Sequence, residues 1–568
     1  MNINNPLAYE QYSYDAFTRT AIGSLAAGYK LGKFELQFDA GYNSIDTRER
    51  SVIPSYAQDP ASSPRDLHYA ARTSIESYLL QARVTYRQSW RRFNFSATGG
   101  ASRYVENDKR NAPTDTVGQT DAAGLSGNTV ADYRNAGCYG YVEMDMDRRL
   151  FLNMTVRADA SSRIAPSDGN FYSRAAGIAW LFRKLDTTKS DLSFFSSGKA
   201  RLTYGVTGSD AIPDYGYQPG WQSVTIDLPS QLAGAIYPTA PANPSLSWQR
   251  FEKSSVGATL GFFKDQLILD VVYYRNYAKQ LMVRYNLSLT AGFSYEYRNW
   301  PAVIRNDGLE LSFTKRAKET SRVKWMSVVN LTIPRSTLVA YPKIEESPYA
   351  KTLIVGQSMS TVWLFKYTGV NPQTGTYTFQ DFDGDGKYTD ADKKAVGKPG
   401  IRMYGNWTNS VQKGPWQMTV LLQGIVQTGV DYQRDIFYAN APGMFSPGFF
   451  SNQTTKVLDH WQKPGDRGRY QKFSTMGTSD AGKLIPFYIN STGILENASF
   501  LSLRFVTLSY DLPAKLLSRL HLKKSCRIYI QGQNLYTLTP YEDVDPSLQS
   551  GLICPLPKSI GAGILVNL

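Results

Sequence analysis

The sequence predicts an all-β protein, a transmembrane antiparallel β-barrel of about 18 strands. Long segments alternate apolar and polar residues, as expected for strands with one apolar face. The connections between them alternate between very short and very long, and bacterial outer-membrane barrels have short turns on one side and long loops on the other. No run of about 18 apolar residues is present, so transmembrane helices are not expected.

The composition fits this fold class. Of the 568 residues, 19% are charged, 13% are aromatic and 38 are tyrosine. Only alternate residues of a barrel strand meet lipid, so a Tyr-rich, moderately polar chain is suitable. The formal net charge of +14 indicates a surface that faces acidic lipid headgroups or polysaccharide. Because the Lys and Arg residues are dispersed, nucleic-acid binding is not expected.

The alternating segments are arranged as hairpins. The first spans Thr20 to Ile45, with a tight turn at Gly32–Lys33. The pattern recurs along the chain, at 78–86 and 93–99, 140–145 and 150–158, 256–262 and 267–273, 408–412 and 416–422, and 526–530. The region 171–208 supplies two more strands. Many segments run about ten residues or more, longer than the usual five or six of soluble sheets.

The connections divide into two classes. Short turns are expected near residues 32, 91, 148, 264 and 414. Long connections are expected over about 46–73, 106–132, 209–250, 336–400 and 429–498. Aromatic residues lie beside the short turns, where a girdle at the membrane interface is expected; they are Trp90, Phe93, Phe262, Phe263 and Trp416.

The C-terminal segment alternates apolar residues from Ile560 to Leu568. By itself this pattern is compatible with an edge strand of a soluble sheet and with the closing strand of a barrel. The repeated hairpins and the asymmetry of the connections favour the closing strand, and hence a location in the outer membrane.

Catalytic motifs are not evident. The cysteines Cys138, Cys526 and Cys554 are odd in number and widely spaced, so neither a disulfide framework nor a CxxC metal site is indicated. The three histidines are far apart in the sequence, and GxSxG, HExxH and P-loop motifs are not present. We therefore do not expect an enzyme.

One local pattern matches an EF-hand-type calcium loop over residues 381–392. The candidate ligand positions are Asp381, Asp383, Asp385, Lys387 through its backbone carbonyl, Thr389 and Asp392. Gly386 stands at the sharp turn, and hard oxygen ligands at this spacing suit Ca²⁺. The alternative is a polar Asp/Gly turn that hydrogen-bonds its own backbone. A bound ion would rigidify the long 336–400 connection.

Four tryptophans lie in or near the long connections: Trp221, Trp248, Trp300 and Trp363. Their rings could stack on sugars, but packing within the connections is the expected role. We assign no substrate-binding residue from this set.

Seven segments together resemble the SusC/RagA-type TonB-dependent outer-membrane transporters. They occur in the family's order and cover most of the chain, at 141–164, 197–215, 243–257, 303–313, 379–397, 497–513 and 528–548. The resemblance implies a barrel of about 22 strands with a separate N-terminal plug. It also implies energy from the TonB complex, a SusD-like lipoprotein lid, surrounding outer-membrane lipids, and oligosaccharide or peptide substrates.

The resemblance covers the barrel portion alone. We expect residues 1–568 to form one partial barrel domain, from which the N-terminal plug and about four strands are missing. The N-terminal residues also show no signal peptide. Two alternatives to active import remain at this point. The chain could be a structural barrel fragment without active transport, or a passive porin without a plug.

Overall fold

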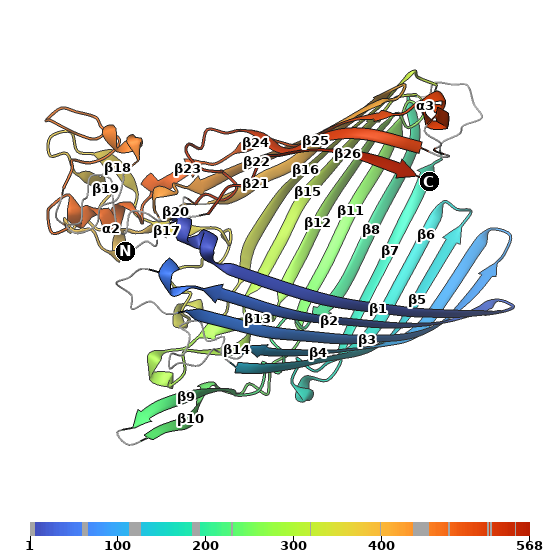
Figure 1. The fold of residues 1–568 in the computed structure, drawn as a ribbon, viewed down its shortest axis with the longest axis horizontal. Coiled ribbons are helices and arrows are strands. Elements are labelled where there is room, and N and C mark those ends of the chain that lie inside the picture. The colour runs from blue at the N-terminus through green and yellow to red at the C-terminus, as the bar shows by residue number, and fades with distance from the viewer. Residues whose placement is uncertain are drawn as a thin grey trace. The chain divides into compact units, whose positions relative to one another are not determined.

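β-strands build most of the protein in the computed structural model (Figure 1). The structure describes residues 6–58, 66–112, 127–184, 194–228, 231–318, 320–397, 399–434, 454–474, 477–519, 522, 525–550 and 553–567. Within these ranges, eighteen strands belong to one sheet, which confirms the predicted number. None of the helices found there has the length and apolar character needed to span a bilayer.

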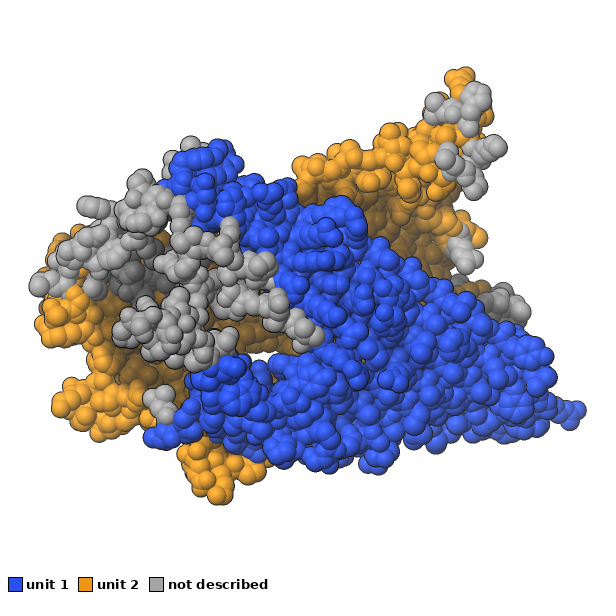
Figure 2. All heavy atoms as spheres, turned by 60° about the horizontal axis from the view of Figure 1, so that its bottom comes forward, with its two compact units in different colours: residues 1–180, 203–254, 278–302 blue, residues 181–202, 255–277, 303–568 orange. Residues whose placement is uncertain are grey.

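The chain divides into two compact units, which Figure 2 colours separately. Unit 1 contains residues 1–180, 203–254 and 278–302, and unit 2 contains residues 181–202, 255–277 and 303–568. Four strands have residues in both units: β7 (Phe171–Arg183), β8 (Phe195–Ser209), β11 (Gln249–Phe262) and β12 (Leu267–Lys279).

Unit 1 is built on successive hairpins. Its strands are β1 (Ser13–Leu31), β2 (Phe34–Ile53), β3 (Leu67–Ser89), β4 (Phe93–Ala112), β5 (Gly127–Met146) and β6 (Leu150–Ser161). Each pairs antiparallel with the next, and β6 pairs with β7. Two smaller hairpins lie in its connections, β9 (Gly220–Leu228) with β10 (Gln231–Ala240), and β13 (Leu281–Asn286) with β14 (Tyr295–Trp300).

Unit 2 continues the same pattern. Its sheet strands are β15 (Val303–Arg316), β16 (Val323–Ala340), β21 (Gly400–Lys413), β22 (Trp416–Val430), β23 (Leu495–Asn497), β24 (Phe500–Asp511), β25 (Ser525–Leu538) and β26 (Ser559–Asn567). Two small two-stranded sheets pair β17 (Val362–Leu364) with β20 (Lys394–Gly397) and β18 (Tyr367–Val370) with β19 (Tyr377–Phe379). The α-helices among its described residues are α2 (Ile485–Tyr488) and α3 (Ala514–Arg519).

Single 3-10 turns occur in the connections of both units. They are η1 (Pro6–Gln11), η2 (Ser55–Ala57), η4 (Pro166–Asp168), η5 (Leu289–Ala291), η6 (Ile344–Glu346), η7 (Asp390–Asp392), η8 (Thr455–Leu458), η9 (Gly482–Leu484) and η10 (Thr492–Ile494).

The short turns lie where the sequence predicts them. Tight hairpin turns need left-handed backbone at one or both central residues. Gly32 and Gly414 supply it with φ of 59° and 58° between β1 and β2 and between β21 and β22. Asp147 and Arg148 adopt φ of 55° and 52° between β5 and β6. The turn aromatics Trp90 and Trp416 are 57% and 52% exposed, as a girdle requires.

Two of the predicted long connections are shorter than expected. β2 continues to Ile53 and β3 begins at Leu67, so both strands run into the predicted 46–73 connection. β4 and β5 likewise run into the predicted 106–132 connection. The residues there are polar, which indicated a loop, but cross-strand pairs stabilise the strand conformation. Arg72 Nη2 lies 2.9 Å from Asp46 Oδ2, and the Tyr14 hydroxyl donates to Glu49 at 2.6 Å.

The C-terminal strand β26 pairs antiparallel with β25, from Ser525↔Asn567 to Gln533↔Ser559. Its apolar residues are exposed, with Ile560 at 77% and Ile564 at 67%. This exposure fits an outward, lipid-facing surface. Leu568 lies outside the described residues.

The two longest connections, 341–399 and 431–499, fold on each other in unit 2. They share a set of buried side chains, which we call the connection core: Phe365, Tyr377, Phe379, Tyr470, Ile485, Tyr488, Ile489 and Ile494. The Tyr377 and Tyr488 rings stack at 4.2 Å between centroids. The sequence predicts two separate long connections, whereas in the structure they share a core.

The hydroxyl groups of two core tyrosines, Tyr377 and Tyr470, differ in their hydrogen bonding. The Tyr377 hydroxyl is buried, and no hydrogen-bond partner for it occurs among the described residues. The Tyr470 hydroxyl accepts from Gln433 Nε2 at 3.1 Å, and both residues are buried.

A charged cluster borders the connection core. Asp431 is 1% exposed; its Oδ1 accepts from the Gln433 N–H at 3.0 Å, and its Oδ2 lies 3.9 Å from Arg469 Nη2. Arg469 also pairs with Glu496. Burial raises the pKa of Asp431 above its usual range, and the nearby Glu496 adds to this, against the Gln433 N–H, Lys456 and Arg469.

We expect the same Tyr→Phe substitution to have opposite effects at these two core positions. Tyr377→Phe removes an unpaired buried hydroxyl, so stability is unchanged or rises by about 1 kcal/mol. Tyr470→Phe leaves the Gln433 amide unpaired and costs about 1–3 kcal/mol. Hydrogen-exchange protection of residues 477–500 is the measurement. Equal losses at both positions would contradict the assigned bonding.

We also expect Asp431 to oppose stability at neutral pH. The folded-state pKa of Asp431 is raised, so the protonated carboxyl stabilises the fold relative to the ionised one. This contribution to the free energy of unfolding is fully present below the ordinary carboxyl pKa of about 3.9 and is lost as pH rises through the raised value. Asp431→Asn should remove this pH dependence from the protection of the connection core and keep the bond from the Gln433 N–H. The control is Asp480→Asn, because Asp480 is exposed. The same pH profile of protection in both variants would refute the assignment.

Candidate functional site

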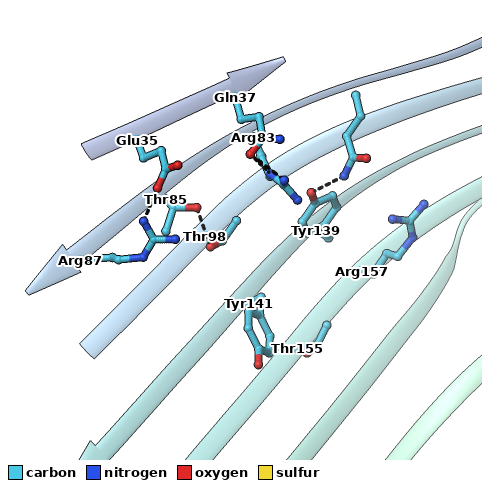
Figure 3. A pocket seen from close by; sticks show the side chains of 11 residues that line it. Glu35, Gln37, Arg83, Thr85, Arg87, Thr98, Tyr139, Tyr141, Thr155 and Arg157 are labelled. Carbon is cyan, nitrogen blue, oxygen red and sulfur yellow. Dashed lines mark hydrogen bonds and ion pairs between the residues drawn. The ribbon is translucent and has the colours of Figure 1, made fainter. Parts of the chain in front are cut away.

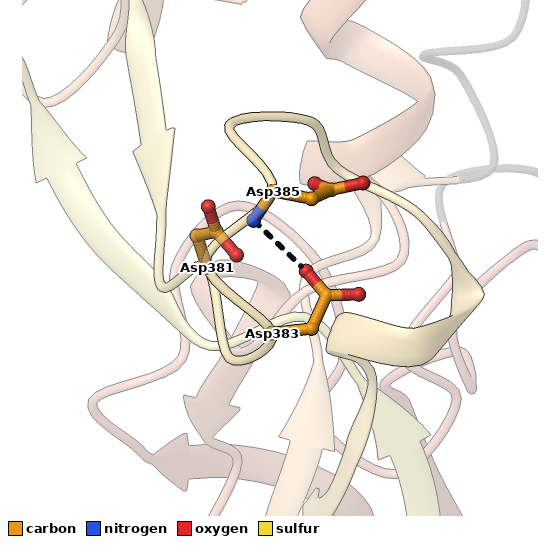
Figure 4. A group of neighbouring side chains, drawn as sticks. All are labelled: Asp381, Asp383 and Asp385. Carbon is orange, nitrogen blue, oxygen red and sulfur yellow. Dashed lines mark hydrogen bonds between the residues drawn. The ribbon is translucent and has the colours of Figure 1, made fainter.

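The predicted calcium loop, residues 381–392, follows β19 in the first of the two long connections. We call it the acidic loop. One carboxylate oxygen from each of Asp381, Asp383 and Asp385 lies within 4.8 Å of the others (Figure 4). Calcium binds oxygen ligands at about 2.3–2.6 Å, so oxygens on opposite sides of the ion stand about 5 Å apart. The spacing of the three carboxylates therefore fits one Ca²⁺.

Backbone N–H groups hold these carboxylates in place. Asp381 Oδ1 accepts from the Gly384 N–H at 2.6 Å, and its Oδ2 accepts from the Gly386 N–H at 2.9 Å. The left-handed φ of 77° at Gly386 makes the sharp turn that this requires. Asp385 Oδ1 accepts from the Lys387 N–H at 2.8 Å.

The pKa values of the first two carboxyls move in opposite directions. The N–H groups of Gly386 and then Gly384 hold the pKa of Asp381 below its usual range. The Asp385 N–H lowers the pKa of Asp383, but desolvation and repulsion from Asp385 and Asp392 outweigh it and raise that pKa overall. Such mutual repulsion is what a bound cation relieves.

The second half of the loop differs from the predicted ligand set. Asp392 is fully buried; its Oδ1 accepts from the Phe382 N–H at 2.7 Å and its Oδ2 from the Thr389 N–H at 3.0 Å. The Thr389 hydroxyl accepts from the Ala391 N–H at 3.2 Å, so the pair caps η7. Of the six predicted ligand residues, the structure thus brings the carboxylates of Asp381, Asp383 and Asp385 together. Thr389 and Asp392 bond to the backbone and close the loop.

A polar pocket of about 560 Å³ lies on unit 1 (Figure 3). Its walls are the polar residues of β2 to β6: Glu35, Gln37, Gln81, Arg83, Thr85, Arg87, Thr98, Tyr139, Tyr141, Thr155 and Arg157. They share one face of the sheet because side chains alternate along each strand. The strand register sets Thr85 opposite Thr98, and their hydroxyls lie 2.9 Å apart.

Hydrogen bonds between strands order this pocket. Arg83 donates through Nε and Nη2 to Gln37 Oε1 at 3.1 and 2.6 Å, and Gln81 Nε2 donates to the Tyr139 hydroxyl at 2.7 Å. Arg87 pairs with Glu35. These residues are not predicted as a site from the sequence. Their signal is the run of Gln, Arg and Thr at alternate positions, which by itself indicates only the polar side of each strand.

The four tryptophans of the connections divide in the structure. Trp248 and Trp300 are 6% and 8% exposed, which confirms the packing role expected for them. Trp221 is 61% exposed, contrary to that expectation, because it lies on the β9–β10 hairpin. Trp363 lines a second pocket, in unit 2.

Curated relatives cover almost the whole chain. The chain is 23% identical over 584 aligned positions to TonB-dependent receptor P3 of Formosa agariphila, covering 96% of this chain and 56% of that receptor. It is 21% identical to TonB-dependent receptor SusC of Bacteroides thetaiotaomicron, covering 79% of this chain and 44% of SusC. The chain thus spans about half the length of these relatives. No family model matches it.

Solved structures agree on the fold. The RagAB peptide transporter superposes with a TM-score of 0.82 at 17% identity, covering 98% of this chain and 63% of the transporter chain. The same complex in an open state superposes with a TM-score of 0.81. The matched proteins are TonB-dependent receptors and a peptide transporter, and the predicted β-barrel class and outer-membrane location of this chain are confirmed. The chain is therefore related to the SusC/RagA-type TonB-dependent receptors and has their barrel fold.

Proposed function

We propose that this chain forms the barrel wall of a TonB-dependent importer of oligosaccharides or peptides in the outer membrane. The observation that carries the proposal is similarity along nearly the whole chain, in sequence to TonB-dependent receptors and in fold to the RagAB peptide transporter. In this proposal the TonB complex supplies energy, and a SusD-like lipoprotein covers the extracellular side.

The polar pocket of unit 1 supports this substrate class. Its guanidinium, amide and hydroxyl groups are the donors and acceptors that both sugars and peptide bonds require. Side chains that are already ordered by hydrogen bonds lose little freedom when they bind a solute. The pocket therefore suits a polar, hydrogen-bonding substrate.

The passive porin and the structural fragment are the competing functions. A porin conducts solutes without energy, whereas a fragment without a transport role changes no uptake. Both retain the fold described above, so the energy dependence of uptake separates them from an importer.

We expect deletion of the gene to lower the uptake of a labelled oligosaccharide or peptide mixture by whole cells. A protonophore, or inactivation of TonB, should lower uptake in the parent cells to the level of the deletion strain, since import depends on energy. Uptake that persists after the protonophore but disappears on deletion would indicate a porin. Uptake that deletion leaves unchanged would refute a transport role.

We also propose that the acidic loop binds Ca²⁺. Asp381, Asp383, Asp385 and the Lys387 backbone carbonyl would hold the ion, with Thr389 and Asp392 closing the loop around it. A bound ion would neutralise the three carboxylates and tie this part of the connection to one conformation.

We expect Asp383→Asn to weaken Ca²⁺ binding at least tenfold, because it removes one charged ligand and keeps the shape of the side chain. Titration calorimetry of the folded chain with Ca²⁺ is the measurement. Asp545→Asn is the matched control, since Asp545 also accepts from a backbone N–H two residues on, at 2.8 Å, in another connection. Absence of binding by the unchanged chain would leave the alternative of a self-bonded Asp/Gly turn.

A further inference from the structure

A second pocket, of about 610 Å³, lies within unit 2 between the two long connections. This volume is in the range of small-molecule sites. Residues 350–352, 361–364, 390, 391, 393 and 399 come from the first connection, and Val430, Arg434, Asn490 and 494–495 come from the second connection and the end of β22. We call it the connection pocket.

Apolar side chains form much of its wall. Leu364 and Ile494 are 8% and 2% exposed, and Trp363, Val362 and Leu495 are half-buried. Ile494 belongs to the connection core, and the β17–β20 pairing fixes the register of residues 362–364. The backbone next to the pocket is also bonded between the connections, since the Phe365 N–H donates to the Asn490 carbonyl at 3.0 Å. The pocket is therefore part of a packed structure.

Two polar groups of the lining are unsatisfied. Trp363 Nε1 and Thr361 Oγ1 are both buried, and neither has a hydrogen-bond partner in the described part of the chain. They stand two residues apart in the chain, where the turn at Ser358–Thr361 leads into β17. Buried polar groups are rarely left without partners, and the indole N–H can only donate. An acceptor on a bound molecule would satisfy them once a small shift of the pocket wall exposes the two atoms, which have almost no accessible surface.

The charge of the lining is positive. It contains three cationic side chains, Lys351, Lys393 and Arg434, and one carboxylate, Asp390. Lys393 Nζ lies 2.9 Å from Asp390 Oδ1, so this carboxylate is already paired. Lys351 and Arg434 are exposed, and no ion pair joins either of them to another described side chain within 4 Å. The pocket therefore complements an anion.

We propose that the connection pocket binds a small amphipathic carboxylate, whose apolar group lies against Trp363, Leu364 and Ile494 and whose anionic end meets Lys351 and Arg434. A neutral sugar of the same size would leave Arg434 without an anionic partner and Lys351 with only Asp390, which lies beyond ion-pair distance. The proposal concerns binding alone and does not depend on the proposed import function.

The test uses a pair of probes that differ only in charge, N-acetyl-L-phenylalanine and its neutral amide. Binding to the purified chain in lipid nanodiscs is measured by ligand-observed NMR. We expect saturable binding of the carboxylate and at least tenfold weaker binding of the amide. Equal affinity for both probes, or saturable binding of neither, overturns the proposal.

Variants then locate the site. Lys351→Gln with Arg434→Gln should weaken carboxylate binding at least tenfold, and Trp363→Phe, which keeps a ring and removes the N–H, should weaken it severalfold. Lys483→Gln is the matched control, because Lys483 is an exposed lysine of the second connection outside the pocket lining. Hydrogen-exchange protection of the connection core shows whether each variant is folded. Unchanged binding by the folded double variant overturns the proposal.

Discussion

Backbone hydrogen bonding is the constraint on which the rest of the structure depends. A segment that crosses lipid meets no water that could satisfy its N–H and C=O groups, so each strand must pair along its whole crossing. β4 and β5 meet this requirement over the 20 residues of each strand, from Phe93↔Met146 to Ala112↔Gly127. Neighbouring hairpins repeat the same solution, with short turns where a strand reverses.

This pairing divides the side chains of every strand between two faces. On β2 and β3, Leu36 and Leu80 are exposed on one face, whereas Gln37 and Arg83 meet in the polar pocket on the other. An apolar face that would be a liability in water is suitable against lipid. The polar pocket therefore follows from the same alternation that makes the outer face apolar.

The long connections lie beyond this constraint and use a different source of stability. Aromatic and isoleucine side chains between residues 365 and 494 pack into the connection core, and Asp431 with Arg469 places buried charge at its border. Two candidate sites of different chemistry result, an acidic loop and a pocket with excess positive charge. At 17% identity, the shared fold with the RagAB transporter says nothing of these side chains, so their chemistry has to be argued from this chain.

Much of the fold could be predicted from the sequence because it depends on local pattern. Alternation of side chains identified the hairpins, and the residues at Gly32, 147–148 and Gly414 marked their turns. The continuation of β2 past Asp46 and Glu49 to Ile53 could not be predicted, because cross-strand pairs with Arg72 and Tyr14 override a locally polar composition.

The candidate sites divide in the same way. The Asp381–Asp385 spacing is local and was read directly from the sequence, whereas the role of Asp392 as a buried cap depends on how the chain returns to Phe382. The connection pocket joins Trp363 to Arg434 and Ile494, which are far apart in the sequence. The sequence by itself determined the strands, their faces and the acidic loop, since these follow from neighbours along the chain. Only the tertiary structure decided which distant segments share a core and a pocket, because that depends on packing between connections that have no common pattern.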